Sequence, residues 1–199
     1  MNKITVVTGN SKKLWQAQTV FEPMGITADG EDVPIHEIQS PDGDIHGVEI
    51  AREKAKAAFE VLARPLIVCD QYWEIPALGG FPGPYMKDMD EYLEVEDILA
   101  MMACKDNRVI NLYENVVYTD GEVIKDFTAV YPGTLATEAR GGGQPSGRLI
   151  IYDGTDLTIA EHRERGEHAR DMEQSAWKMF GEWYVNKPMQ TSGGKDGCE

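Results

Sequence analysis

The segment Thr8-Gly9-Asn10 combines a glycine with two short polar side chains, directly after the β-rich run 4–8 and before a predicted helix. A glycine here lets a ligand come close to the backbone, and the N-terminus of a helix attracts negative charge. Lys12 and Lys13 stand in the first turn of that helix. Because a cation opposes the helix dipole there, we expect at least one of them to serve a ligand. The segment therefore predicts an anion site, and a capped helix with solvated lysines is the alternative.

Asp70 follows the apolar run 66–69, and the carboxyl end of a strand is a usual place for a catalytic side chain in an open α/β sheet. A carboxylate near an anion site suits the cleavage of a phosphoanhydride, which needs Mg²⁺ to offset phosphate charge and to acidify a water. Mg²⁺ takes one or two carboxylates together with substrate oxygens and waters. Asp70 is therefore a candidate metal ligand.

A second glycine-containing segment, residues 77–87, reads Ala-Leu-Gly-Gly-Phe-Pro-Gly-Pro-Tyr-Met-Lys. Its glycines permit positive φ, and Pro82 and Pro84 stiffen the turn, so the backbone can be held close to a ligand. Lys87 stands at the start of the next predicted helix, where its ammonium can reach a phosphate as a point charge. The alternative is a rigid connector that ends in a solvent-exposed lysine.

In this order, and with Asp70 between them, the two segments resemble the motifs of the inosine/xanthosine triphosphate pyrophosphatase family, also called Ham1-like. The string Leu-Gly-Gly-x-Pro-Gly-Pro-Tyr-x-Lys is the most specific match, and the similarity extends from about residue 3 to about residue 183. The resemblance implies Mg²⁺ held by Glu37 and Asp70, with Lys13 completing the catalytic set, although Glu37 by itself reads as an exposed loop acid. It also implies a set of phosphate-binding residues, namely Thr8, Gly9, Asn10, Lys13 and Lys87.

Other positions depart from the family, mainly where the base should bind. The family's two acids and hydroxyl residue are represented here by Cys69, Asp70 and Gln71. Its base-stacking motif, Gly-Phe-Gly-Tyr/Trp-Asp-Pro, gives way to residues 143–148, Gly-Gln-Pro-Ser-Gly-Arg. The slots of its Ser-His-Arg motif fall on residues 171–173, Asp-Met-Glu. Because selectivity for a purine's 6-oxo edge depends on paired polar groups in the pocket, we expect a changed base preference.

Aromatic residues and arginines nearby could supply new contacts to the base. Tyr72, Trp73 and Tyr152 offer stacking surfaces, although core packing is the commoner role of such rings. Arg148 and Arg170 could read the edge of a base, with solvated surface arginines as the alternative.

The leading hypothesis is a Mg²⁺-dependent nucleoside triphosphate pyrophosphatase that converts a (d)NTP to a (d)NMP and pyrophosphate. The competing hypothesis is a catalytically inactive nucleotide-binding or protein-interaction module on the same fold, suggested by Cys69 and the altered base motifs. A Maf-like pyrophosphatase is a third, and the Gly-Gly-x-Pro-Gly-Pro-Tyr string argues against it. The resemblance also implies a homodimer.

The bulk properties narrow the range of partners. A net charge of −15 argues against a nucleic-acid polymer, which needs clustered Lys and Arg, but it permits a small polyanion bound by a few local cations. Cys69, Cys104 and Cys198 form no CxxC pair, so neither a zinc site nor a disulfide framework is expected, and a reducing cytoplasm is the simplest location. No apolar run approaches ~18 residues, so no membrane span is expected.

The elements that must position these residues alternate between strand and helix in the first half and become mostly strands in the second. Expected strands are 4–8, 66–69, 109–113, 115–119, 122–131 and 149–152, with turns at Asp120-Gly121 and Pro132-Gly133. Apolar spacing predicts helices over about 11–21, 48–62, 86–103 and 169–183. We therefore expect one domain over 1–185 and a polar tail over 186–199. Its fold would be α/β, an elongated mixed β-sheet flanked by helices, with two lobes around a central cleft.

Overall fold

A single mixed sheet forms the centre of the computed structural model, which describes residues 2–35 and 47–187. Its seven strands have the order β2-β1-β3-β5-β6-β7, with β4 paired to β3. The first three strands of that order are parallel, and the others are antiparallel to their neighbours. The strands are β1 (Asn2–Val7), β2 (Ile26–Glu31), β3 (Leu66–Glu74), β4 (Pro82–Gly83), β5 (Val109–Thr119), β6 (Ile124–Leu135) and β7 (Ile150–Tyr152).

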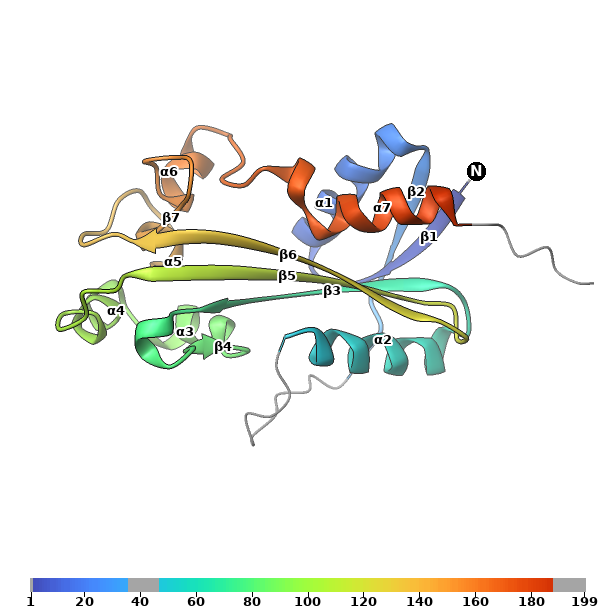
Figure 1. The fold of residues 1–199 in the computed structure, drawn as a ribbon, viewed down its shortest axis with the longest axis horizontal. Helices are drawn as coiled ribbons and strands as arrows, with labels where there is room; N and C mark the ends of the chain where they lie inside the picture. Colours follow the sequence, from blue (N-terminus) through green and yellow to red (C-terminus); the bar gives the residue numbers. More distant parts are fainter. Residues whose placement is uncertain (1, 36–46, 188–199) are drawn as a thin grey trace, which may run out of the picture.

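Helices cover both faces of one end of this sheet (Figure 1). α1 (Ser11–Phe21) and α7 (Ala176–Asn186) pack together on one face, and α2 (Val48–Leu62) lies on the other. Phe21, Trp177 and Phe180 are fully buried between the first two helices and the sheet. The small residues Ala51, Ala55 and Ala58 instead let α2 lie close against β3 and β5.

Short helices gather around the other end of the sheet, and they form the second lobe (Figure 1). They are α3 (Met86–Tyr92), α4 (Val95–Met101), α5 (Pro145–Leu149) and α6 (Ile159–Glu164). The 3₁₀ turns are η1 (Glu22–Met24), η2 (Pro76–Leu78) and η3 (Met172–Gln174). The long β5–β6 hairpin runs through both lobes, so the expected mixed sheet with flanking helices is confirmed. None of the helices within the described ranges is long and apolar enough to cross a membrane.

The strand predictions are wrong in several details. β3 continues past Asp70 to Glu74, so Asp70 lies inside the strand and not at its end. The two strands expected over 109–119 are one, and β6 passes through Pro132-Gly133 without a turn. Proline is accommodated there because pairing with β7 begins only at the next residue. β2 was not predicted, since only two of its six side chains, Ile26 and Ala28, are buried.

The helix predictions over 86–103 and 169–183 are also wrong in their extent. The first is two helices, because the Glu94 side chain and Asp97 form a capping box that begins α4. The last begins only at Ala176, where the Ser175 side chain caps the N-terminus, after a separate 3₁₀ turn. Leu149 ends α5 and does not begin β7.

Candidate functional site

A cavity of about 810 Å³ opens beside the N-terminus of α1 and the middle of β3. It is lined by every predicted phosphate-binding residue, Thr8, Gly9, Asn10, Lys13 and Lys87, and by Asp70. The three sequence segments that predicted a polyanion site therefore meet in space. The other predicted metal ligand, Glu37, lies outside the described residues.

Local hydrogen bonds fix the turn between β1 and α1. The Asn10 side chain accepts from the Lys12 backbone N–H at 2.9 Å and caps the helix, while the Asn10 N–H donates to Thr8 Oγ1 at 3.1 Å. The Thr8 N–H donates to the Glu31 carbonyl of β2 at 2.9 Å. The turn is thus held from both sides, with its exposed glycine facing the cavity.

Two lysines of the cavity wall, Lys13 from α1 and Lys54 from α2, each contact β3. The Lys13 ammonium donates to the Cys69 carbonyl at 2.9 Å. The Lys54 ammonium, from α2, lies 2.7 Å from Asp70 Oδ1, and both side chains are largely buried. Lys54 was missed by the sequence analysis. The signal was present, because Lys54 interrupts the otherwise apolar stripe of α2 formed by Ile50, Ala51, Ala55 and Ala58.

Cys69 replaces an acid of the family motif, and its surroundings explain why it cannot act as one. The side chain faces the main core on the opposite side of β3 from Asp70. Burial raises the pKa of its thiol to about 12, so the group stays neutral. Within the described ranges no group of three or more Asp, Glu, His or Cys side chains gathers as a metal site. Asp70, with one oxygen paired to Lys54, still suits Mg²⁺, which needs few protein ligands.

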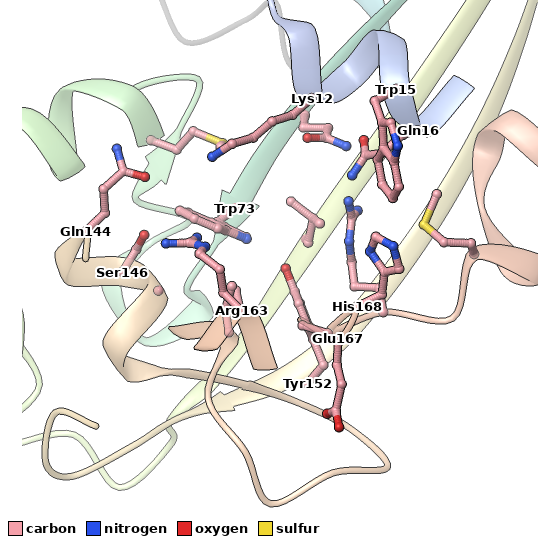
Figure 2. A pocket seen from close by; sticks show the side chains of 18 residues that line it. Lys12, Trp15, Gln16, Trp73, Gln144, Ser146, Tyr152, Arg163, Glu167 and His168 are labelled. Atoms are coloured by element: carbon pink, nitrogen blue, oxygen red, sulfur yellow. The ribbon is translucent and has the colours of Figure 1, made fainter. Parts of the chain in front are cut away.

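A second cavity, of about 370 Å³, joins the first. The two share Gln71, Trp73, Met86 and Gln144 in their walls. Figure 2 shows side chains that point into the second cavity from both lobes. Because they share these wall residues, the two cavities form one continuous groove.

Three of the five predicted base contacts, Trp73, Tyr152 and Arg170, line the second cavity. Tyr72 and Arg148 line neither cavity. Side chains alternate along β3, so Tyr72 faces away from Trp73 and stacks on Tyr113 at a centroid distance of 4.9 Å. Arg148 instead donates to the Gly141 carbonyl at 3.0 Å and so ties its own loop.

Sequence reasoning missed several other residues in the second cavity. Trp15 of α1 stacks on His168, with ring centroids 4.9 Å apart, and joins the two lobes at the cavity wall. Arg163 of α6 lies beside residues 141–144, the glycine-rich loop that precedes α5. A Cβ on Gly143 would stand 3.0 Å from the Arg163 guanidinium. The absence of an aromatic ring from that loop leaves room for this arginine.

A carboxylate–serine contact holds the same loop against α3. Asp90 accepts from the Ser146 backbone N–H at 2.9 Å and from its hydroxyl at 2.6 Å. Both oxygens are used, and Ser146 is 2% exposed. The contact fixes the start of α5 at the junction of the two cavities, since Asp90 lines the first and Ser146 the second.

Comparison with known proteins finds similar sequences over most of the chain. The profile of the Ham1 family matches residues 4–183. The dITP/XTP pyrophosphatase of Methanopyrus kandleri is 32% identical over 189 residues, which cover 92% of this chain and 97% of that protein. The inosine triphosphate pyrophosphatase of Aspergillus oryzae is 28% identical over 191 residues, which cover 92% of this chain and 94% of that protein.

Solved structures show the same fold. A HAM1 protein from Coxiella burnetii superposes with a TM-score of 0.77 at 20% identity, over 94% of this chain and all (100%) of that one. The Ham1 protein of Staphylococcus aureus gives a TM-score of 0.73 at 19% identity, with the same two coverages of 94% and 100%.

Proposed function

The chain belongs to the Ham1 family, and from this premise we propose that it is a Mg²⁺-dependent nucleoside triphosphate pyrophosphatase. It would hydrolyse a (d)NTP to the (d)NMP and pyrophosphate. The observation that supports this most directly is the meeting of Thr8-Gly9-Asn10, Lys13, Lys54, Asp70 and Lys87 around one cavity. The related archaeal proteins named dITP/XTP pyrophosphatases support the same reaction class.

Three lysines and a helix N-terminus would bind the triphosphate. Lys13 and Lys87 neutralise the β- and γ-phosphates from two sides of the cavity, and Lys54 adds a third cation beside Asp70. Thr8 and Asn10 orient the chain of phosphates through the turn that they hold. This arrangement would bring the α-phosphorus near Asp70.

Asp70 would act on the attacking water. Asp70 and Glu37 would hold Mg²⁺, which when bound would supply charge compensation and a more acidic water. The Asp70 carboxylate accepts a proton from the water whose oxygen attacks the α-phosphorus, and the bond from that phosphorus to the bridging oxygen breaks. Pyrophosphate leaves with the electron pair. The ammonium of Lys54 positions the Asp70 carboxylate for this step.

We also propose that the base preference differs from that of the dITP/XTP enzymes. Residues 143–148 carry neither an aromatic ring nor an Asp, and positions 171–173 carry Asp-Met-Glu. The walls of the second cavity are built instead from Trp15, Trp73, Tyr152, Arg163 and Arg170.

The test is product analysis with Mg²⁺ over canonical, deaminated and modified ribo- and deoxynucleoside triphosphates. Release of pyrophosphate from one nucleotide, with a loss of about a hundredfold or more in Asp70→Asn, is expected. Circular dichroism of the variant checks that the fold is kept. Nucleotide binding without turnover for every base and metal would overturn the proposal and favour the inactive binding module.

We further propose a homodimer, which the family resemblance supports, and a cytoplasmic location, which the cysteine usage supports. Sedimentation velocity at micromolar concentration measures the oligomeric state directly, and a monomer at all concentrations would contradict the proposed homodimer.

A further inference from the structure

Glu114 is a carboxylate buried completely (0% exposed) on β5, beneath the second cavity. Its Oε1 accepts from the Gln71 amide at 2.8 Å and from the Arg170 guanidinium at 3.2 Å. Its Oε2 accepts from the Ala176 backbone N–H at 3.0 Å. A buried charge is costly unless it is paired and hydrogen-bonded, and Glu114 meets both conditions. Its position therefore depends on the groups that surround it, two of which line the groove.

The contact with Glu114 decides which way the Gln71 amide points. An ionised carboxylate only accepts hydrogen bonds, so the amide must present its NH₂ to Glu114. The carbonyl oxygen of Gln71 is then left as an acceptor, and it has no hydrogen-bond partner within residues 2–35 and 47–187. Gln71 lines both cavities, at the place where the phosphate end of the groove joins its base end.

Arg170 is also held in place by Glu114, but it presents hydrogen-bond donors to the groove, whereas Gln71 presents an acceptor. One of its N–H groups is used on Glu114, and its guanidinium lies 4.8 Å from the centroid of the Tyr131 ring. Its side chain is 11% exposed and lines the second cavity. Because Arg170 and Gln71 share one oxygen of Glu114, a donor and an acceptor stand side by side.

The Trp73 indole forms part of the wall of the groove. Its ring is 8% exposed and lines both cavities. Its buried N–H faces the hydroxyl of Tyr152, which lines the second cavity as well. The indole therefore offers a base a fixed flat surface.

We propose that Gln71 and Arg170 read the hydrogen-bonding edge of the nucleobase, with Glu114 as the positioning residue for both and the Trp73 ring as the wall beside them. The inference rests on the proposed function and deepens it. The substrate class is a nucleoside triphosphate whose base carries an N–H or amino donor beside a nitrogen or oxygen acceptor. A base with acceptors alone is rejected, because the carbonyl oxygen of Gln71 would lose its water and gain no partner.

The experiment uses two nucleotides whose bases keep ring acceptors and lack every donor, purine riboside triphosphate and 2-pyrimidinone riboside triphosphate. Each is compared with the natural nucleotides of the same ring size by kcat/KM, with inorganic tripolyphosphate as a substrate that has no base. The variants are Gln71→Met, which keeps the size and removes the acceptor, and Glu114→Gln. Gln174→Met, an exposed glutamine bonded to Asp171, is the matched control.

In the wild type, the best natural base should exceed its donor-free analogue by on the order of tenfold or more. Gln71→Met should bring that ratio toward one, whereas Gln174→Met should leave both the ratio and tripolyphosphate hydrolysis unchanged. Glu114→Gln should also lower the ratio, since a neutral amide no longer fixes the Gln71 orientation. If circular dichroism shows that Glu114→Gln does not fold, Gln71→Met decides alone.

A wild-type ratio near one, or a ratio that Gln71→Met does not change, would overturn the inference while leaving the pyrophosphatase intact. Binding of the same nucleotides is measured by calorimetry in parallel. If no nucleotide is hydrolysed, the proposed function fails, and the ratio of binding constants still decides whether these residues read the base.

Discussion

At the scale of single residues, the site depends on where β3 directs its side chains. Asp70 faces α2 and meets Lys54, whereas Gln71 lines the groove and Trp73 packs toward the main core and base cavity. One strand therefore contributes the proposed metal ligand, Asp70, and two residues of the base cavity, Gln71 and Trp73. Cys69 contributes through its backbone carbonyl, which accepts the hydrogen bond from Lys13.

Lys54→Met should lower kcat/KM by on the order of a hundredfold, because it removes a cation from the phosphate cavity and frees the Asp70 carboxylate. Lys56→Met is the matched control, since Lys56 pairs with Glu53 on the exposed side of the same helix. Steady-state kinetics of both variants with the preferred nucleotide provide the measurement. Equal activity of Lys54→Met and wild type would exclude the role given to this lysine.

At the scale of elements, the end of α7 is fastened to the β5–β6 turn. The Lys187 ammonium lies 2.7 Å from Asp120 Oδ2 and 3.0 Å from the Tyr118 hydroxyl. Burial favours the protonated acid, but the hydrogen bonds from Lys187 and from the Val123 backbone N–H outweigh it and lower the pKa of Asp120 to about 2. The contact thus joins the last helix to the hairpin that spans the molecule.

Because the folded-state pKa of Asp120 is below its ordinary value, the stabilisation is present above about pH 4 and is lost as the pH falls toward 2. Asp120→Asn should lower the free energy of unfolding by about 1–2 kcal/mol at pH 7. The difference from wild type should shrink as the pH approaches 2. Urea unfolding at several pH values measures this. Asp126→Asn on the same hairpin, where the pair with Arg52 is more exposed, should cost less.

At the scale of the whole molecule, the groove spans both lobes. Its phosphate end is lined by residues of β1, α1, α2 and α3, and its base end by residues of α5, α6 and the segment that follows α6. The Trp15–His168 stack and the shared wall residues connect the two ends. A nucleotide bound as proposed would occupy both cavities at once, whereas a bare triphosphate would occupy only the first.

Hydrogen exchange can separate these two cases. A non-hydrolysable nucleoside triphosphate should slow exchange at the turn 8–10 and also over residues 163–170, because it fills both cavities. Inorganic tripolyphosphate should slow exchange at the turn alone. Protection of residues 163–170 by tripolyphosphate would contradict the assignment of the second cavity to the base.

The phosphate end could be predicted from sequence because each of its parts is a local motif. Thr8-Gly9-Asn10 and Lys87 can be recognised in the sequence because each lies beside a glycine and the start of a predicted helix. The base end could not, because its residues are brought together by strand register and by packing between distant segments. Whether Tyr72 or Trp73 faced the groove depended on the pleat of β3, and the meeting of Gln71, Glu114 and Arg170 depended on the pairing of β3 with β5.

The unbroken β5–β6 hairpin gives the phosphate site a fixed support, whereas the segments around the base cavity are short connections outside it. Eleven residue pairs hold these strands in register, and β5 in turn holds β3 at Asp70, so the chemistry sits on a frame that substitutions in the outer loops leave in place. The glycine-rich loop 141–144 and the segment 165–171 connect shorter elements at the rim of that frame. New side chains there can alter which base is accepted without moving the phosphate site. Related proteins can therefore differ in the base that they accept while they catalyse the same reaction.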